Sequence, residues 1–80
     1  MSTQYRKTMR KSWIIVADAT SQVSIPKHIR TCFYNEWQAK DAAQGLAESY
    51  DGHSEHIVLN VVDSLTHEVV ATYENDIYLG

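Results

Sequence analysis

Residues 35–50 read Asn-Glu-Trp-Gln-Ala-Lys-Asp-Ala-Ala-Gln-Gly-Leu-Ala-Glu-Ser-Tyr, and their apolar side chains repeat at helical spacing. The apolar positions fall three or four residues apart and form one stripe: Ala39, Ala42, Ala43, Leu46, Ala47 and Tyr50. Asn35 is a good N-cap, and Gln38 stands where its side chain can close a capping box. Gly52 is placed to end the helix in a left-handed cap. The pattern predicts a helix from residue 35 to about residue 51.

This stripe consists mostly of alanine, so the helix backbone can come close to whatever lies beneath it. A β-sheet is the surface flat enough to use such a close approach. The opposite side of the helix carries polar residues: Lys40, Asp41, Gln44 and Glu48. Trp37, in the first turn, is expected to be a core or rim aromatic.

Beyond Gly52 the apolar period changes to two, which predicts strands over residues 55–63 and 68–74. The residues between them, Asp-Ser-Leu-Thr-His, have the turn chemistry of a short hairpin. This segment resembles the Asp-x-x-Thr-Gly-Glu-Val hairpin of many small bacterial and phage domains, with His67 in place of the usual glycine. Histidine tolerates the left-handed backbone region better than most residues.

Two further strands are expected before the helix, over residues 12–19 and 28–34, joined by a wide loop that contains Pro26. The predicted fold is therefore α+β, in the order β-β-α-β-β, with an antiparallel sheet and one helix packed on one face. If Ile57, Leu59, Val61, Val69, Ala71 and Tyr73 face the helix, the outer sheet face carries Val58, Val62 and Val70. Such an apolar patch fits a homodimer interface, another partner surface, or ordinary exposed apolar area.

The length of 80 residues suits one hydrophobic core, and the charge is unevenly distributed along the chain. Residues 1–11 carry +4 with no acidic residue, whereas the chain from residue 36 onward has nine acidic residues against Lys40 alone, a net −8. We therefore divide the chain into a basic N-terminal arm, residues 1–11, and a single α+β domain, residues 12–80.

Cysteine content and hydropathy indicate the compartment. Cys32 is the only cysteine, which excludes an internal disulfide and fits the reducing cytoplasm. Its place on a predicted strand is typical of a small buried residue. The apolar run at residues 13–17 is too short for a signal peptide or a membrane span.

Motifs for catalysis or cofactor binding are lacking in the sequence. The three glycines, Gly45, Gly52 and Gly80, form no phosphate-binding loop, so a nucleotide cofactor is not expected. The segment Asp-Gly-His-Ser-Glu-His at residues 51–56 has metal-ligand types, but His53 and His56 lack a second spaced pair, and a polar loop explains them better. The sequence predicts a protein that is not an enzyme and has no cofactor or metal site.

Nucleic-acid binding is the runner-up function. Phosphate contacts would have to come from the arm residues Arg6, Lys7, Arg10 and Lys11, joined at most by Lys27 and Arg30. The acidic body and the shortage of stacking aromatics on the predicted third strand argue against it.

In its size, acidic balance, lone cysteine and lack of catalytic motifs, the chain resembles the small accessory proteins that phages and mobile elements encode against host machinery, anti-CRISPR proteins among them. The resemblance implies a protein-binding module that blocks a host protein or ribonucleoprotein complex by occlusion. The candidate partner-binding residues are acidic and would occupy a basic groove meant for nucleic acid: Glu36, Asp41, Glu48, Asp51 and Glu55. A solvated helix face is the simpler explanation of the same charges.

Overall fold

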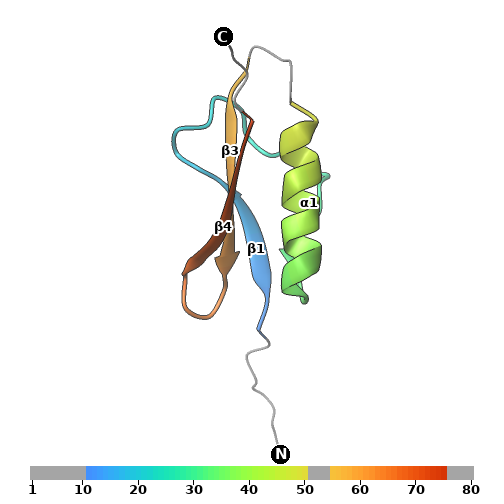
Figure 1. The fold of residues 1–80 in the computed structure, drawn as a ribbon, viewed down its shortest axis with the longest axis vertical. Helices are drawn as coiled ribbons and strands as arrows, with labels where there is room; N and C mark the ends of the chain where they lie inside the picture. The colour runs from blue at the N-terminus through green and yellow to red at the C-terminus, as the bar shows by residue number, and fades with distance from the viewer. Residues whose placement is uncertain (1–10, 51–54, 76–80) are drawn as a thin grey trace, which may run out of the picture.

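The computed structural model describes residues 11–50 and 55–75, which form a four-stranded antiparallel sheet with one helix against it (Figure 1). The elements in chain order are β1 (Trp13–Ala17), β2 (Cys32–Phe33), α1 (Glu36–Glu48), β3 (Ile57–Asp63) and β4 (Val69–Asn75). The strand order in the sheet is β2-β1-β3-β4. The predicted α+β fold, β-β-α-β-β with the helix on one face, is confirmed.

The core lies between α1 and the inner face of the sheet. Ala39, Ala43 and Ala47 are buried on the helix side, and they meet a layer of larger apolar side chains from the sheet: Ile15, Phe33, Ile57, Leu59 and Val61. The fully buried helix residues contribute only methyl groups, so the bulky residues of β3 fill the space beneath them, and Leu46 packs against the same core while partly buried. The alanine stripe therefore has the role that its spacing predicts.

The ends of α1 differ from the prediction. Asn35 is the N-cap residue with extended backbone, but its Nδ2 donates to Gln38 Oε1 at 3.2 Å, so within the described chain its side chain caps no helix N–H. The expected capping box is thus wrong. At the other end the helix stops at Glu48, where Ser49 Oγ donates to the Leu46 carbonyl at 2.6 Å. Gly52, the predicted end, lies outside the described residues.

The second strand is much shorter than the seven residues predicted. The chain turns after Pro26, whose carbonyl accepts the Ile29 N–H at 3.0 Å, and it reaches β1 only where Thr31 O accepts the Ile15 N–H at 2.8 Å. Two residues, Cys32 and Phe33, then pair with β1. Cys32 is exposed on this edge strand, so the expectation that it is buried is wrong.

A β-bulge changes which valines face outward on β4. Val61 pairs with Ala71, but Val62 pairs with Val69, so Val70 is the extra residue. Val70 packs against the core, whereas Val69 is 50 % exposed. The predicted assignment of Val69 to the inner face and Val70 to the outer face is therefore wrong.

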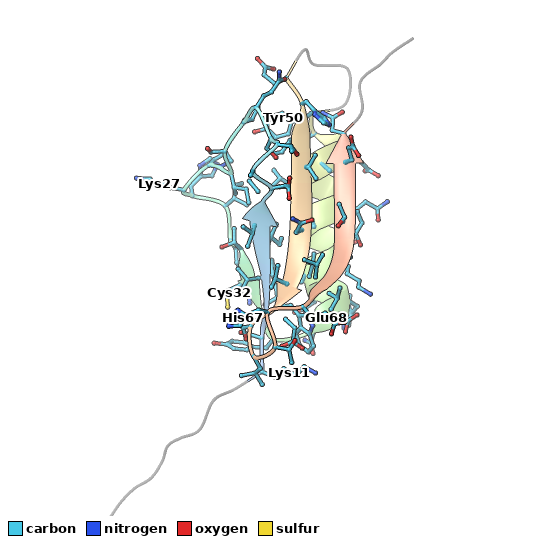
Figure 2. The ribbon with its side chains drawn as sticks, turned by 90° about the vertical axis from the view of Figure 1, so that its left-hand side faces the viewer. Lys11, Lys27, Cys32, Tyr50, His67 and Glu68 are labelled. Carbon is cyan, nitrogen blue, oxygen red and sulfur yellow. The ribbon has the colours of Figure 1, made fainter. Side chains whose placement is uncertain are left out.

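The outer sheet face, seen in Figure 2, is partly covered. Val58 is only 9 % exposed, because the β1–β2 connection crosses beside it and Ser21 Oγ bonds both its N–H and its carbonyl, at 2.8 Å each. Residues at one level of the register form an apolar row across all four strands: Cys32, Ile14, Val62 and Val69. Of the predicted patch of Val58, Val62 and Val70, only Val62 belongs to this row, because Val58 is buried and Val70 packs against the core.

The β3–β4 hairpin has the conformation expected from its sequence. The Asp63 N–H donates to the Glu68 carbonyl, and the His67 N–H donates to the Asp63 carbonyl, both at 2.8 Å. His67 has φ 63°, the left-handed conformation that glycine usually adopts in this turn. The left-handed backbone expected at this turn position is therefore present at His67.

None of the helices in the described part of the chain has the length and apolar character needed to cross a membrane.

Candidate functional site

The outward face of α1 is the candidate surface, and the buried alanines determine which residues lie on it. With Ala39, Ala43 and Ala47 held against the sheet, the exposed positions on the opposite side are Trp37, Asp41, Gln44 and Glu48. Their spacing of four, three and four residues places them in one stripe. A rise of 1.5 Å per residue separates Asp41 from Glu48 by about 10 Å along the helix axis.

Trp37 is the most exposed large apolar side chain in the described structure, at 68 %. The sequence prediction placed it in the core or at its rim, and its exposure excludes the core. The signal that would have found it is the helical register, since Trp37 precedes Asp41 by four residues and belongs to the polar stripe, not to the alanine stripe. Tyr34, just before the helix, is also more than half exposed.

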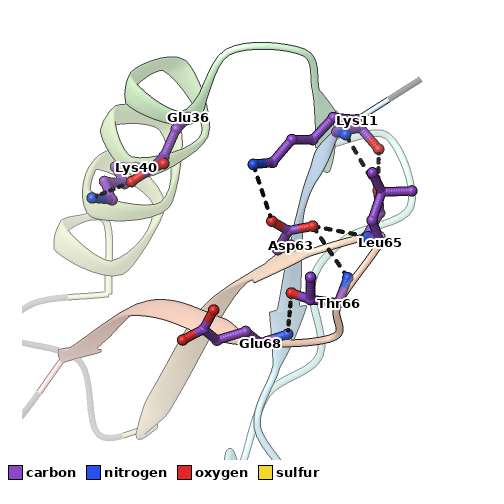
Figure 3. Close-up of polar contacts among 9 residues, drawn as sticks. Lys11, Glu36, Lys40, Asp63, Leu65, Thr66 and Glu68 are labelled. Carbon is purple, nitrogen blue, oxygen red and sulfur yellow. Dashed lines mark hydrogen bonds and ion pairs between the residues drawn. The ribbon is translucent and has the colours of Figure 1, made fainter. Parts of the chain in front are cut away.

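The five predicted acidic residues do not form one cluster. Asp41 and Glu48 both lie on the outward stripe. Glu36 precedes Lys40 by one helical turn, and its Oε2 forms an ion pair with the Lys40 Nζ at 2.7 Å (Figure 3). The hydrogen bond to the Glu36 carboxylate, together with the negative charge of that group, raises the pKa of the Lys40 ammonium above its usual value. Glu55 is exposed just before β3, and Asp51 lies outside the described residues. The fold therefore brings together two of the five carboxylates, and a lysine partly neutralises a third.

Of the predicted basic arm only Lys11 is described; Arg6, Lys7 and Arg10 lie outside the described residues. The Lys11 Nζ is 3.5 Å from Asp63 Oδ2 (Figure 3), and it also lies 5.3 Å from the centre of the Trp13 ring. Both contacts hold its charge at the hairpin end of the sheet. Lys11, the last residue of the predicted arm, is thus paired with the Asp63 carboxylate at the hairpin end of the sheet.

Asp63 is an acceptor for the hairpin backbone. Its Oδ1 accepts the N–H groups of Leu65 at 2.9 Å and Thr66 at 3.3 Å, and Thr66 Oγ1 in turn accepts the Glu68 N–H at 3.2 Å (Figure 3). The bond from Leu65, more than the nearby Lys11 charge, holds the pKa of the Asp63 carboxyl below its usual range. This geometry organises the turn between β3 and β4.

The histidine segment gives one described contact. His56 Nε2 lies 2.9 Å from Glu74 Oε2 across the β3–β4 pair, whereas Asp51 and His53 fall outside the described residues. In residues 11–50 and 55–75 no three His, Cys, Asp or Glu side chains stand together as metal ligands would. The metal hypothesis gains no support from the described part.

Comparison with known proteins identifies no relative: no protein-family model, no curated protein and no solved structure matches this chain.

Proposed function

We propose that the chain is a non-enzymatic protein-binding module that engages a basic surface of its partner through the outward face of α1. The observation that supports this is the exposure of Trp37, 68 %, on the same helical stripe as Asp41 and Glu48. Tryptophan is among the residues that contribute most to binding when an interface covers them. The two carboxylates would pair with arginine or lysine around that anchor and guide the approach of a basic surface.

The partner class that fits is a host complex that handles nucleic acid, as expected of a phage-encoded inhibitor of the anti-CRISPR type acting in the cytoplasm. A groove that binds nucleic acid is lined with basic side chains. Asp41 and Glu48 present two carboxylates, about 10 Å apart along the helix axis, whose charge has the sign that such a groove binds. The stripe would therefore occupy such a groove in place of phosphates and exclude the natural ligand by occlusion.

The test is a phage-restriction assay in bacteria with an active CRISPR–Cas system and a phage that it targets. Expression of the chain is expected to restore plaque formation. Trp37→Ala and the pair Asp41→Lys with Glu48→Lys should remove that effect. Glu68→Lys, a charge reversal at an exposed carboxylate of the β3–β4 hairpin, is the matched control and should leave the effect unchanged. Equal protection by all variants would refute a role for this face.

Direct binding of nucleic acid through Arg6, Lys7, Arg10 and Lys11 is the alternative function, and it rests on the +4 charge of residues 1–11. It predicts that the purified chain shifts oligonucleotides and that the affinity falls steeply between about 50 and 200 mM salt. Replacement of the four residues by alanine would abolish the shift, whereas the α1 variants would not affect it. The two functions are thus separated by which set of variants changes the outcome.

A further inference from the structure

β4 forms a long open edge of the sheet. It is the last strand in the order β2-β1-β3-β4, and within the described residues no strand pairs with it on the side away from β3. The opposite edge strand, β2, has only two residues, while β4 has seven. An edge of this length offers a row of main-chain donors and acceptors to another strand.

The orientation of the β3 backbone follows from a contact beyond the end of β1. The Asp18 N–H donates to the Val58 carbonyl at 2.8 Å, so the main-chain groups of Val58 face the β1 side. Successive residues of a strand direct these groups to opposite sides. Leu59, the next residue, therefore directs its N–H and carbonyl toward β4.

The same alternation identifies the open groups of β4. Leu59 pairs with Tyr73, so the main chain of Tyr73 faces β3. Its neighbours Thr72 and Glu74 must then direct their N–H and carbonyl groups away from the sheet. The outward main-chain groups of Thr72 and Glu74 therefore form the open edge, and the bulge at Val70 precedes them along the strand.

Few of the usual protections are present along this edge. Natural sheets protect edges with lysine, proline or bulges; β4 contains neither lysine nor proline, and its one bulge, at Val70, precedes Thr72 and Glu74. Its one charged residue is Glu74, whose side chain is half exposed on the outer face beside His56. A residue added opposite Glu74 would have its Cα about 5.5 Å away, within reach for an ion pair. The net charge of −3 disfavours a second copy of the chain and favours a basic segment.

We propose that the open edge of β4 binds an extended peptide segment of a partner protein as a fifth strand, with an arginine or lysine of that segment opposite Glu74. The Thr72 and Glu74 main chains supply the hydrogen bonds, and the Glu74 carboxylate selects the basic residue. This surface is distinct from the outward face of α1, so the proposal does not depend on the function proposed above.

The test is a nuclear magnetic resonance titration of the isotope-labelled full chain with the capped peptide Thr-Arg-Val-Thr-Val-Thr-Gly, which places its arginine opposite Glu74 in antiparallel pairing. The amides of Thr72 and Glu74 should shift and become protected from exchange. The same peptide with glutamate in place of arginine should bind about fivefold more weakly. Glu74→Arg should reverse this preference.

Two variants at position 72 separate the main-chain contribution from that of the side chain. Thr72→Pro removes the outward N–H without removing a donor to β3, and it should weaken peptide binding about tenfold. Thr72→Val keeps that N–H but removes the hydroxyl that donates to Asn60 Oδ1, so it should bind the peptide as the natural chain does. If the proline variant does not fold, the reversed preference of Glu74→Arg still decides the outcome.

Three results would overturn the proposal. The first is the absence of any shift at Thr72 and Glu74 with the peptide at about 1 mM, where even weak binding would register. The second is protection of both amides in the free chain at low concentration, which would show that the chain covers its own edge. The third is protection that rises with protein concentration, which would assign the edge to a second copy.

Discussion

Asp63 Oδ1 accepts the main-chain N–H of Leu65 at 2.9 Å, and this bond joins the last residue of β3 to the turn that follows it. The bond has two consequences, one for the pH dependence of folding and one for the stability of the hairpin.

Stability should fall in acid. Hydrogen bonds to the Asp63 carboxylate, and those that Thr20 and Asn60 donate to the Asp18 carboxylate, depress the pKa values of both groups in the folded state. A depressed pKa contributes stability above the unfolded value, about 3.9, and that contribution is lost as the pH falls through the folded pKa. The melting temperature should therefore decrease as the pH falls below about 4. A melting temperature independent of pH in that range would contradict this.

Asp63→Ala should lower the melting temperature of the natural chain. The substitution removes the acceptor for two turn N–H groups and the ion pair with Lys11. Asp63→Asn keeps an acceptor oxygen but loses the charge, so its melting temperature should lie between those of the alanine variant and the natural chain. Thermal unfolding followed by circular dichroism measures the order of the three proteins, and an alanine variant as stable as the natural chain would exclude a role for the bond.

His67 should be replaceable with a gain in stability. Its φ of 63° is costly for a residue with a side chain, so His67→Gly should stabilise the chain by up to about 1 kcal/mol. His67→Val, with a branched Cβ, should destabilise it. Denaturant unfolding compares the free energies, and a valine variant more stable than the glycine variant would show that the turn is not left-handed.

The two faces of α1 should respond oppositely to a larger side chain. Ala43 is fully buried, so Ala43→Leu should cost about 1–3 kcal/mol through overpacking against the sheet. Gly45 is exposed, and a Cβ there meets nothing within 4 Å, so Gly45→Ala should stabilise the helix by about 0.5–1 kcal/mol. The free energy of unfolding in urea tests both, with each variant as the control for the other.

Leu59 tests the sheet side of the same core. It is fully buried on β3 beneath the alanine stripe, and Leu59→Ala should cost about 2–5 kcal/mol. Thr72→Ala, on an exposed position of the adjacent strand, should cost much less. Similar losses for the two substitutions would mean that the helix does not cover this part of the sheet.

The elements that the sequence predicted well are those with local signals. The alanine stripe of α1 and the alternation in β3 are repeats along the chain, and the turn at residues 63–67 depends on its own side chains. The bulge at Val70 could not be predicted in this way, because it depends on how β3 and β4 pair across space. The two-residue length of β2 likewise follows from where the preceding loop meets β1.

The candidate site shows the same limit. Asp41 and Glu48 share a face because helical spacing is local, so their pairing could be predicted from the sequence. The ion pair of Glu36 with Lys40 was equally open to prediction, since the two residues are four apart on one helix. Helical spacing also places Trp37 opposite the alanine stripe, although its residue type does not reveal this. The ion pair of Lys11 with Asp63 joins residues far apart in the sequence and could not be predicted from local spacing.

The proposed function requires that the outward face of α1 bind a protein partner through Trp37 and the adjacent carboxylates. Calorimetry should measure the dissociation constant of a purified CRISPR effector ribonucleoprotein for the full chain and for Trp37→Ala, with Leu65→Ala, an exposed apolar side chain of the β3–β4 hairpin, as control. We expect at least a tenfold loss of affinity for Trp37→Ala, typical of a central interface aromatic, and no change for the control. Equal affinity of the two variants and the natural chain, or no binding by any of them, would contradict it.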